Sequence, residues 1–242
     1  MALPKLDVPS YEITLPLCKK VIKFRPFLVK EQKNLLMAME SKDASTVHST
    51  IKDILNNCIL TENIDLDSLP IIDIEYFFIH LRAKSVGEVV NSRYRCNNEP
   101  DGQNQCGNIM EAEINLLDIK PTQDKPAEPE IQLTDKITIK LKYPQFGVVK
   151  DSLQYESLND ITFNMIANSI EYIYDGEQFY YASETTPDEM LSFVEGMNQQ
   201  QFAKVEEFFN NLPELKETIE ITCSKCGYQH KIDVQGLENF FG

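Results

Sequence analysis

The sequence of 242 residues lacks the patterns that mark several large classes of protein. No apolar run approaches the roughly 20 residues that cross a bilayer as a helix, so no membrane contact is predicted. The first residues lack the basic start and apolar stretch of a secretory signal peptide, and we therefore expect a cytoplasmic protein. No phosphate-binding loop, dinucleotide fingerprint, nucleophile elbow or zinc-protease motif is present. We predict no catalytic residue, no small-molecule substrate and no enzymatic activity.

Positive charge is also scarce. The chain has 23 lysines and arginines against 38 aspartates and glutamates, and its formal net charge is −15. Nucleic-acid phosphates attract lysine and arginine, so this balance argues against a general nucleic-acid-binding protein. Basic residues gather at one place, residues 19–33. Two interpretations of that cluster stay open: a docking surface, or the solvated faces of a strand and a helix.

The spacing of apolar residues predicts the elements of the first half of the chain. Residues 11–28 alternate apolar and polar side chains, which is typical of a β-hairpin. Helices are predicted where apolar residues recur every three or four positions, and strands where they alternate. The predicted helices cover residues 29–41, 45–60 and 71–85, and the predicted strands cover 86–96 and 110–119.

The second half begins with residues 119–130, where three prolines and many charges predict a linker or an exposed loop. Further on, alternation predicts a strand from Ile137, and helical spacing predicts a helix over residues 160–173. Asp175-Gly176 is a favoured turn pair and predicts a hairpin over residues 172–181. Two more helices begin at capping residues followed three positions later by Glu or Gln. Those pairs are Thr186 with Glu189 and Asn198 with Gln201.

One arrangement occurs twice in the chain. A strand runs into a cysteine, a second cysteine is followed by glycine, and another strand leaves; this holds at residues 86–118 and again at 216–234. We interpret the two copies as halves of one split zinc ribbon, with a small α+β subdomain inserted between them. The predicted fold class is α+β. The predicted divisions are 1–118 for the hairpin, helices and first ribbon half, 119–215 for the insertion, and 216–242 for the second ribbon half with an aromatic tail.

Four of the six cysteines have the character of metal ligands. Cys223 and Cys226 are separated by two residues and followed by Gly227, a spacing that lets both thiolates face one ion. Cys96 and Cys106-Gly107 provide a second pair, although nine residues separate those two cysteines. We predict a structural zinc ion (Zn2+) held by Cys96, Cys106, Cys223 and Cys226. Four cysteine ligands leave no open position for catalysis.

Other interpretations of these cysteines stay open. They include unrelated buried thiols, a disulfide framework, a redox pair at Cys223 and Cys226, and His230 as a ligand in place of Cys96 or Cys106. The other two cysteines, Cys18 and Cys58, lie on apolar faces and are predicted to be core residues.

Four phrases of the sequence resemble the T4-like bacteriophage baseplate protein family. They are RPFLVKEQKNLLMAMES (25–41), LRAKSVGEVV (81–90), DEMLSFVEGMNQQQFAKVEEFFNNLPEL (188–215) and GLENFF (236–241). The resemblance covers nearly the whole chain. It implies a subunit or assembly factor of the baseplate hub of a contractile-tailed phage, with hub or tail proteins as partners. It also implies a place in the host cytoplasm during assembly and in the virion baseplate.

The phrase GLENFF also suggests where a partner is contacted. Two adjacent aromatic side chains can insert into a groove on a partner or fold back onto this protein, and both alternatives stay open. We take as candidate partner-binding residues Leu237, Phe240, Phe241, Arg25 and Phe27. A competing hypothesis is a zinc-ribbon module that binds nucleic acid. The acidic residues around the cysteines disfavour it, because they balance the nearby arginines and lysines.

Overall fold

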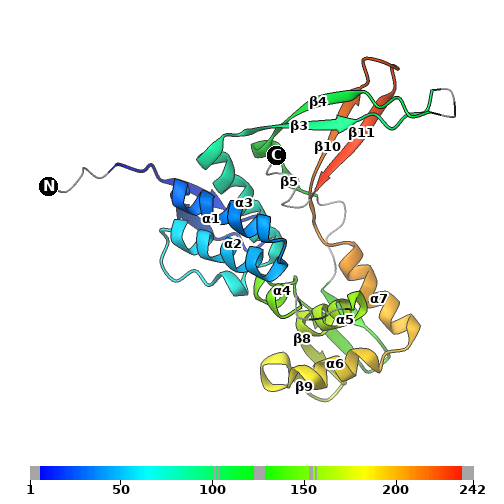
Figure 1. Cartoon of the computed structure of the whole chain (residues 1–242). Helices are drawn as coiled ribbons and strands as arrows, with labels where there is room; N and C mark the ends of the chain where they lie inside the picture. Colours follow the sequence, from blue (N-terminus) through cyan, green and yellow to red (C-terminus); the bar gives the residue numbers. More distant parts are fainter. Residues whose placement is uncertain are drawn as a thin grey trace.

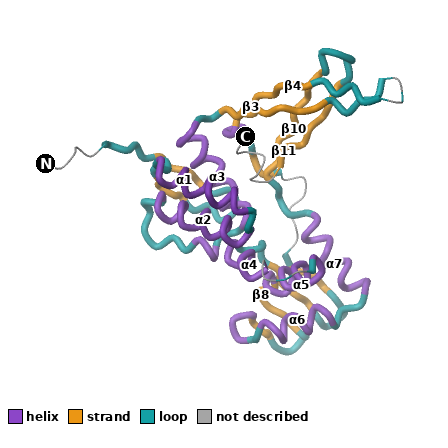
Figure 2. The backbone as a smooth tube through the Cα atoms, in the orientation of Figure 1, coloured by secondary structure: helices purple, strands orange, loops and turns teal. Residues whose placement is uncertain are grey.

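The computed structural model describes residues 6–100, 102, 104–122, 129–152, 155 and 157–235. These residues form three parts: a helical lobe, an arm of two β-hairpins, and a second lobe of helices on a sheet (Figure 1). Within the described ranges no helix is long and apolar enough to cross a membrane. The strands gather mainly in the arm and in the second lobe, while helices dominate the first (Figure 2). The α+β class predicted from the sequence is confirmed.

The first lobe contains the predicted hairpin and the three predicted helices. Strands β1 (Tyr11–Thr14) and β2 (Val21–Phe24) pair antiparallel. They are followed by α1 (Val29–Ser41), α2 (Ala44–Cys58), a short 3-10 helix η1 (Leu66–Ser68) and α3 (Ile71–Val86). Pro70 is the N-cap of α3.

The core of the first lobe follows from the alternation in β2. Ile22 and Phe24 point inward, and the Phe24 ring meets the Phe77 ring of α3 edge-on, with centroids 5.2 Å apart. Cys58 is buried in this core and Cys18 packs partly against it, as the sequence predicted. One core residue, Phe146, comes from much later in the chain.

The arm is made of two hairpins that belong to separate sheets. Strand β3 (Val89–Arg95) pairs with β4 (Ile109–Asn115), which leads into the 3-10 helix η2 (Leu116–Asp118). Strand β10 (Leu215–Thr222) pairs with β11 (Gln229–Gln235) and, at its start, with β5 (Lys120–Pro121). The predicted linker over residues 119–130 is therefore wrong at its beginning, because Lys120 and Pro121 are part of a sheet.

The second lobe is a four-stranded sheet with helices on one face. The sheet order is β6 (Glu130–Gln132), β7 (Thr138–Leu141), β8 (Ile170–Tyr174) and β9 (Phe179–Tyr181), all antiparallel. Its other elements are α4 (Phe146–Ser152), α5 (Leu158–Ser169), η3 (Ala182–Glu184), α6 (Pro187–Glu195) and α7 (Gln199–Asn210). Both predicted capping boxes are present, at Thr186 with Glu189 and at Asn198 with Gln201.

Each part has its own apolar cluster, and the parts also share residues. The second lobe has a core built from the sheet and from α5, α6 and α7. Phe146 of α4 nevertheless packs in the first lobe, where its ring stacks on His48 with centroids 4.3 Å apart. Between α3 and the arm, Ile79 and Ala83 pack with Val90, Leu215 and Val234. The division at residues 118/119 and 215/216 remains a prediction.

Candidate metal centre

The two hairpins of the arm carry equivalent turns. In the β10–β11 turn, the Cys223 N–H donates to the Tyr228 carbonyl at 2.8 Å, and the Gly227 N–H donates to the Cys223 carbonyl at 2.8 Å. In the β3–β4 turn, the corresponding bonds run from the Cys96 N–H to the Asn108 carbonyl at 2.8 Å and from the Gly107 N–H to the Cys96 carbonyl at 3.0 Å. Both glycines have positive φ, +65° at Gly107 and +72° at Gly227, a backbone region that disfavours other residues.

The wide spacing between Cys96 and Cys106 has a local explanation. The Cys106 N–H donates to the Asn98 carbonyl at 2.7 Å, so the chain returns to the turn after an excursion that begins beyond Asn98. Once residues 99–105 are set aside, Cys96 and Cys106 are separated by two residues, as Cys223 and Cys226 are. The nine-residue gap is thus a compact cysteine turn that carries a seven-residue insertion. The β3–β4 hairpin that carries this turn pairs antiparallel as the β10–β11 hairpin does.

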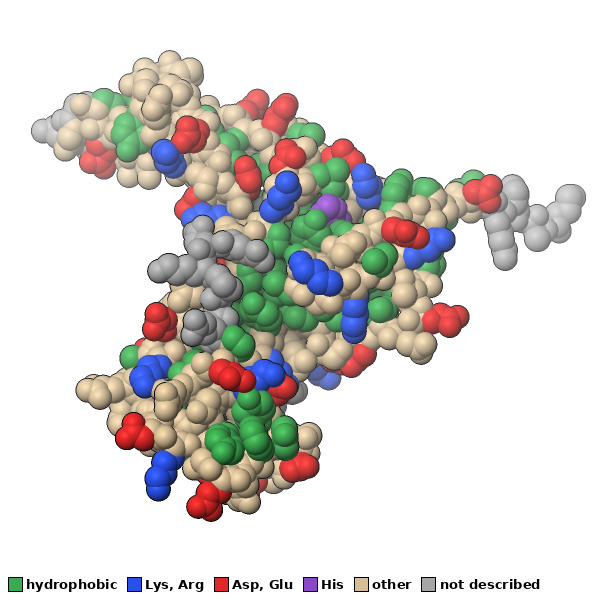
Figure 3. Space-filling model, turned by 180° about the vertical axis from the view of Figure 1, so that it is seen from behind, with side chains coloured by type: hydrophobic (Ala, Val, Ile, Leu, Met, Phe, Trp, Pro, Cys, Tyr) green, Lys and Arg blue, Asp and Glu red, His purple; other side chains and the backbone are tan. Residues whose placement is uncertain are grey.

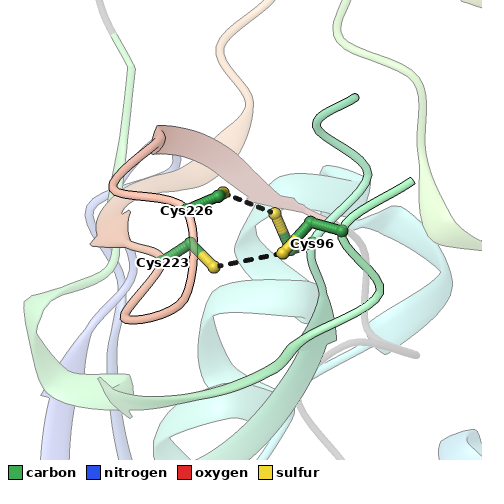
Figure 4. A group of neighbouring side chains, drawn as sticks. Cys96, Cys223 and Cys226 are labelled. Atoms are coloured by element: carbon green, nitrogen blue, oxygen red, sulfur yellow. Dashed lines mark hydrogen bonds between the residues drawn. The ribbon is translucent and has the colours of Figure 1, made fainter. Parts of the chain in front are cut away.

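The turns bring four thiols together. The sulfur atoms of Cys96, Cys106, Cys223 and Cys226 all lie within 4.8 Å of one another, and all four cysteines are free. Cys96 Sγ lies 3.6 Å from Cys226 Sγ, and Cys106 Sγ lies 3.8 Å from Cys223 Sγ. Cys223 and Cys226 point across the gap between the hairpins toward Cys96 (Figure 4). A tetrahedral ion with bonds of about 2.3 Å to sulfur separates its ligands by about 3.8 Å. The cluster is therefore compatible with metal binding.

Two asparagines link the turns by donating to sulfur across the gap. Asn98 Nδ2 lies 3.6 Å from Cys226 Sγ, and Asn108 Nδ2 lies 3.5 Å from Cys223 Sγ. Each side chain belongs to the first turn and each acceptor to the second. Such donors favour the thiolate over the thiol and orient it, as hydrogen bonds to ligand atoms do in metal sites.

The four thiols have unequal acidity. The backbone N–H of Cys226 is the main cause that lowers the pKa of Cys223 to about 6, and the Lys225 N–H and Asn108 add to it. The Tyr228 N–H chiefly lowers the pKa of Cys226. Burial acts in the opposite direction on Cys96 and raises its pKa to about 12. A buried thiol with that pKa remains protonated at neutral pH unless a cation replaces its proton.

His230 lies beside the cluster. Its Nε2 is 3.1 Å from Cys96 Sγ, and the side chain extends from β11. Among the described residues, the set of mutually close ligand atoms consists of the four cysteines and does not include His230. This position makes His230 a hydrogen-bond neighbour of the Cys96 sulfur.

Two of the basic side chains near the cysteines are paired with acidic ones. Arg93 Nε lies 3.3 Å from Glu111 Oε1, and Lys231 Nζ lies 2.8 Å from Glu220 Oε1. Lys225 Nζ donates to the Cys106 carbonyl at 3.2 Å. These partners occupy the positive charges that a nucleic-acid interface would offer to phosphate.

The structure describes two of the five candidate partner-binding residues. Leu237, Phe240 and Phe241 lie outside the described residues. Phe27 is 8% exposed and belongs to the core of the first lobe. Arg25 is 18% exposed, and its Nη2 lies 3.0 Å from Glu31 Oε1. The last two residues therefore present little surface to a partner.

Two residues that shape the site, Asn98 and Asn108, were not predicted from the sequence. Asn98 and Asn108 lie next to the cysteine turns, but amide side chains are common in turns for many reasons. Asn108 follows Cys106-Gly107 directly, so a search for donors flanking each cysteine pair would have found it. Asn98 becomes recognisable only once the excursion after it is known.

The fold and the site define an α+β protein with a closed four-cysteine cluster. A family model described as T4 bacteriophage base plate protein matches residues 8–242, and the chain belongs to that family. The family resemblance noted in the sequence is thereby confirmed. Searches of curated protein sequences and of solved structures gave no significant match.

Family membership gives the chain a structural role in the phage baseplate and implies contacts with other baseplate proteins. It is consistent with a protein that is not an enzyme. The cysteine cluster adds a group of residues compatible with metal binding.

Proposed function

We propose that the protein is a structural or assembly component of the baseplate hub of a contractile-tailed phage and carries one structural zinc ion. The match to the baseplate family over residues 8–242 supports the first part. Assembly through protein contacts in the host cytoplasm and incorporation into the virion baseplate follow from this role. The four neighbouring thiols support the second part, because thiolates at these separations suit Zn2+.

The ligands that we propose are Cys96, Cys106, Cys223 and Cys226. When bound, zinc supplies positive charge that keeps all four sulfurs ionised and links the hairpins. The chain's own groups orient the thiolates, since Asn98 and Asn108 donate to two of them. With four sulfur ligands the ion has no position left for water or substrate, so its role is to hold β3–β4 against β10–β11.

Metal analysis of the purified protein tests the zinc site. We expect one zinc per chain, and the Cys223→Ser variant should lose most of it because three ligands bind more weakly than four. Cys18→Ser is the matched control, since Cys18 lies away from the cluster on the first lobe. Substoichiometric zinc in the wild type, a different metal, or full zinc in Cys223→Ser would contradict the assignment.

The hub assignment is tested in infected cells with a phage whose copy of this gene carries an amber codon. Without the protein, hub intermediates should fail to accumulate, and supplying it from a plasmid should restore them. Mass spectrometry of purified particles then shows whether the chain stays in the virion. Normal hub formation without the protein would contradict the proposed function.

We further propose that Leu237, Phe240 and Phe241 contact a hub or tail partner, with a smaller contribution from Arg25 and Phe27. Adjacent aromatic side chains can bury much apolar area at small entropic cost. The double variant Phe240→Ser with Phe241→Ser should keep its zinc and melting temperature but lose partner binding. A lowered melting temperature would instead show that these rings pack on the protein itself.

A further inference from the structure

The sheet of the second lobe has one face that its helices do not cover. Ile139 and Ile173 are paired across β7 and β8, and both are buried in the core with α5, α6 and α7. Because side chains alternate along a strand, the residues on either side of that row point to the opposite face. The register places two rows there: Glu130, Lys140, Tyr172 and Tyr181, and then Gln132, Thr138, Tyr174 and Phe179.

Four aromatic rings gather at the β8–β9 end of this outer face. Tyr174 stacks on Phe179 with centroids 4.6 Å apart, and Tyr172 meets Phe179 edge-on at 5.2 Å. Tyr181 lies 6.0 Å from both Tyr172 and Phe179. We call Tyr172, Tyr174, Phe179 and Tyr181 the aromatic face. From behind, the second lobe shows a patch of hydrophobic side chains with acidic and basic side chains at its margin (Figure 3).

The aromatic face is costly to leave in water. Phe179 is 48% exposed and Tyr181 is 44% exposed, although both belong to the types that dominate cores and interfaces. They lie on β9, one of the two edge strands of the sheet, which contains neither a charged residue nor a proline. Edge strands that stay free are usually very short, as the three-residue β9 is, or carry such protective residues, so the exposed rings are the stronger indication of a partner and the edge itself the weaker. A contiguous exposed apolar patch marks an interaction surface.

The charges around the aromatic face indicate what kind of partner fits. Exposed carboxylates at Glu130 and Glu171 border the face, and Glu177 is exposed in the turn that joins β8 to β9. The Tyr172 hydroxyl donates to Glu130 Oε1 at 2.9 Å, so this carboxylate is fixed beside the ring. The chain as a whole has a formal charge of −15. The long-range field therefore attracts positive charge, and Glu130 and Glu177 add to it locally, whereas the charge of Glu171 is balanced by Lys140.

A lysine of this chain, Lys140, already lies over one ring of this surface and shows how a lysine or arginine of a partner would be held. Lys140 Nζ lies 5.7 Å from the centroid of the Tyr172 ring and 3.2 Å from Glu171 Oε2. A ring face with a carboxylate beside it is a favourable site for an ammonium or guanidinium group. The side chains of Phe179 and Tyr181 are also exposed to solvent.

We propose that the aromatic face docks a positively charged segment of another baseplate protein, which lays lysine or arginine side chains over the exposed rings of Phe179 and Tyr181 and against the acidic rim. This inference rests on the proposed function, because it assumes a partner in the baseplate. Nucleic acid and anionic lipid are disfavoured by the carboxylates. A second copy of this chain would bring the same negative charge and be repelled.

Site-specific photo-cross-linking tests the proposal in assembly intermediates from infected cells. p-Benzoylphenylalanine replaces Phe179, a change that keeps the ring and adds a reactive group at an exposed position. The matched control carries the same group at Tyr180, which pairs with Ile173 and so points to the other side of β9. We expect position 179 to cross-link to a segment of another baseplate protein that has net positive charge, with at least about fivefold higher yield than position 180.

A charge variant gives a second readout. Glu130→Gln combined with Glu171→Gln should lower the cross-linking yield at position 179 severalfold, and raising the salt concentration should do the same. Cross-linking to a second copy, to an acidic segment or to nothing would overturn the inference. If the chain sediments with baseplate intermediates but position 179 stays unlinked, the aromatic face is not a docking surface, and the proposed function stands. If the chain never joins those intermediates, both fail.

Discussion

At the scale of single residues, a buried carboxylate fixes the loop of the first hairpin. Asp73, in the first turn of α3, is fully buried and accepts the N–H groups of Leu17 and Cys18 at 2.8 and 2.9 Å. These are the backbone groups that the turn between β1 and β2 would otherwise leave unpaired. The carboxylate also lies at the positive end of the α3 dipole, which favours its negative charge.

Asp73→Ala should therefore destabilise the protein by about 2–3 kcal/mol, because two N–H groups lose a charged acceptor and a cavity remains. Urea unfolding measures this loss. Asp53→Ala is the control, since Asp53 is exposed on α2 and its removal should change stability by less than about 0.5 kcal/mol. Equal effects from the two substitutions would show that Asp73 does not organise the loop.

His80 should make stability depend on pH. Its Nε2 is buried and has no hydrogen-bond partner among the described residues. Burial, with a smaller effect of Lys84, lowers the pKa of His80 from 6.5 to about 4. The unfolded chain therefore takes up a proton first, and stability is lost as pH falls from about 6.5 towards about 4. Glu75 opposes this, since burial raises its pKa from 4.5 to about 6, and its contribution is lost as pH rises through that window.

His80→Phe removes the proton uptake and leaves an aromatic ring beside Tyr76, whose centroid lies 4.4 Å from that of His80. Relative to the wild type, the variant should gain about 1 kcal/mol between pH 7.5 and pH 5, after allowance for partial solvent screening. Urea midpoints at the two pH values give this difference. A parallel pH dependence of variant and wild type would contradict the assignment.

At the scale of elements, the glycines of the cysteine turns can be tested without changing a cysteine. Gly227 has φ +72°, and a Cβ built there would meet nothing within 4 Å, so the cost of a side chain is one of backbone conformation alone. Gly227→Ala should lose about 1–2 kcal/mol and weaken zinc retention against a chelator. Gly227→Asn should lose less, because asparagine tolerates left-handed backbone. Thermal melts and competition with a colorimetric chelator distinguish the three proteins, and an alanine variant equal to wild type would refute the argument.

The elements with strong local signals were predictable from sequence. Helices α6 and α7 begin at the residues that their capping pairs indicated, and β2 shows the predicted alternation of exposed and buried side chains. The cysteine pairs were recognisable because metal-ligand spacing is short and local. The insertion between Cys96 and Cys106 was not recognisable from the sequence as part of a compact turn. The turn is closed by one hydrogen bond between Cys106 and Asn98, which the sequence does not reveal.

Elements held by distant partners were missed. Strand β5 has two residues and exists because β10 pairs with it, nearly a hundred residues later in the chain. Helix α4 has seven residues, and its Phe146 fills a gap in the first lobe beside His48. Neither segment has enough periodicity to predict its structure, because tertiary packing decides it. The sequence predicted the hairpin that carries most of the aromatic face. It did not predict that the face is exposed, because exposure depends on which side of the sheet the helices cover.

At the scale of the whole molecule, the cysteine cluster connects hairpins that belong to different sheets. Removing the proposed zinc should loosen the turns at the tips of both hairpins, because the sulfur–metal bonds that link the two turns are lost. Hydrogen exchange measured with and without a chelator should show faster exchange in β3–β4 and β10–β11. The first lobe, with its separate core, should exchange unchanged. Uniform acceleration, or none, would contradict a local role for the metal, and added zinc should restore protection.

The sequence separation within the cluster also sets an order of events during synthesis. Cys223 leaves the ribosome 117 residues after Cys106. At roughly 5–20 residues per second, the first cysteine pair waits on the order of ten seconds for the second. During that time the first lobe can fold, but the arm cannot close. A chain that stops before Cys223 lacks half of the cluster, so the proposed metal site would close only in chains that have been synthesised through Cys226.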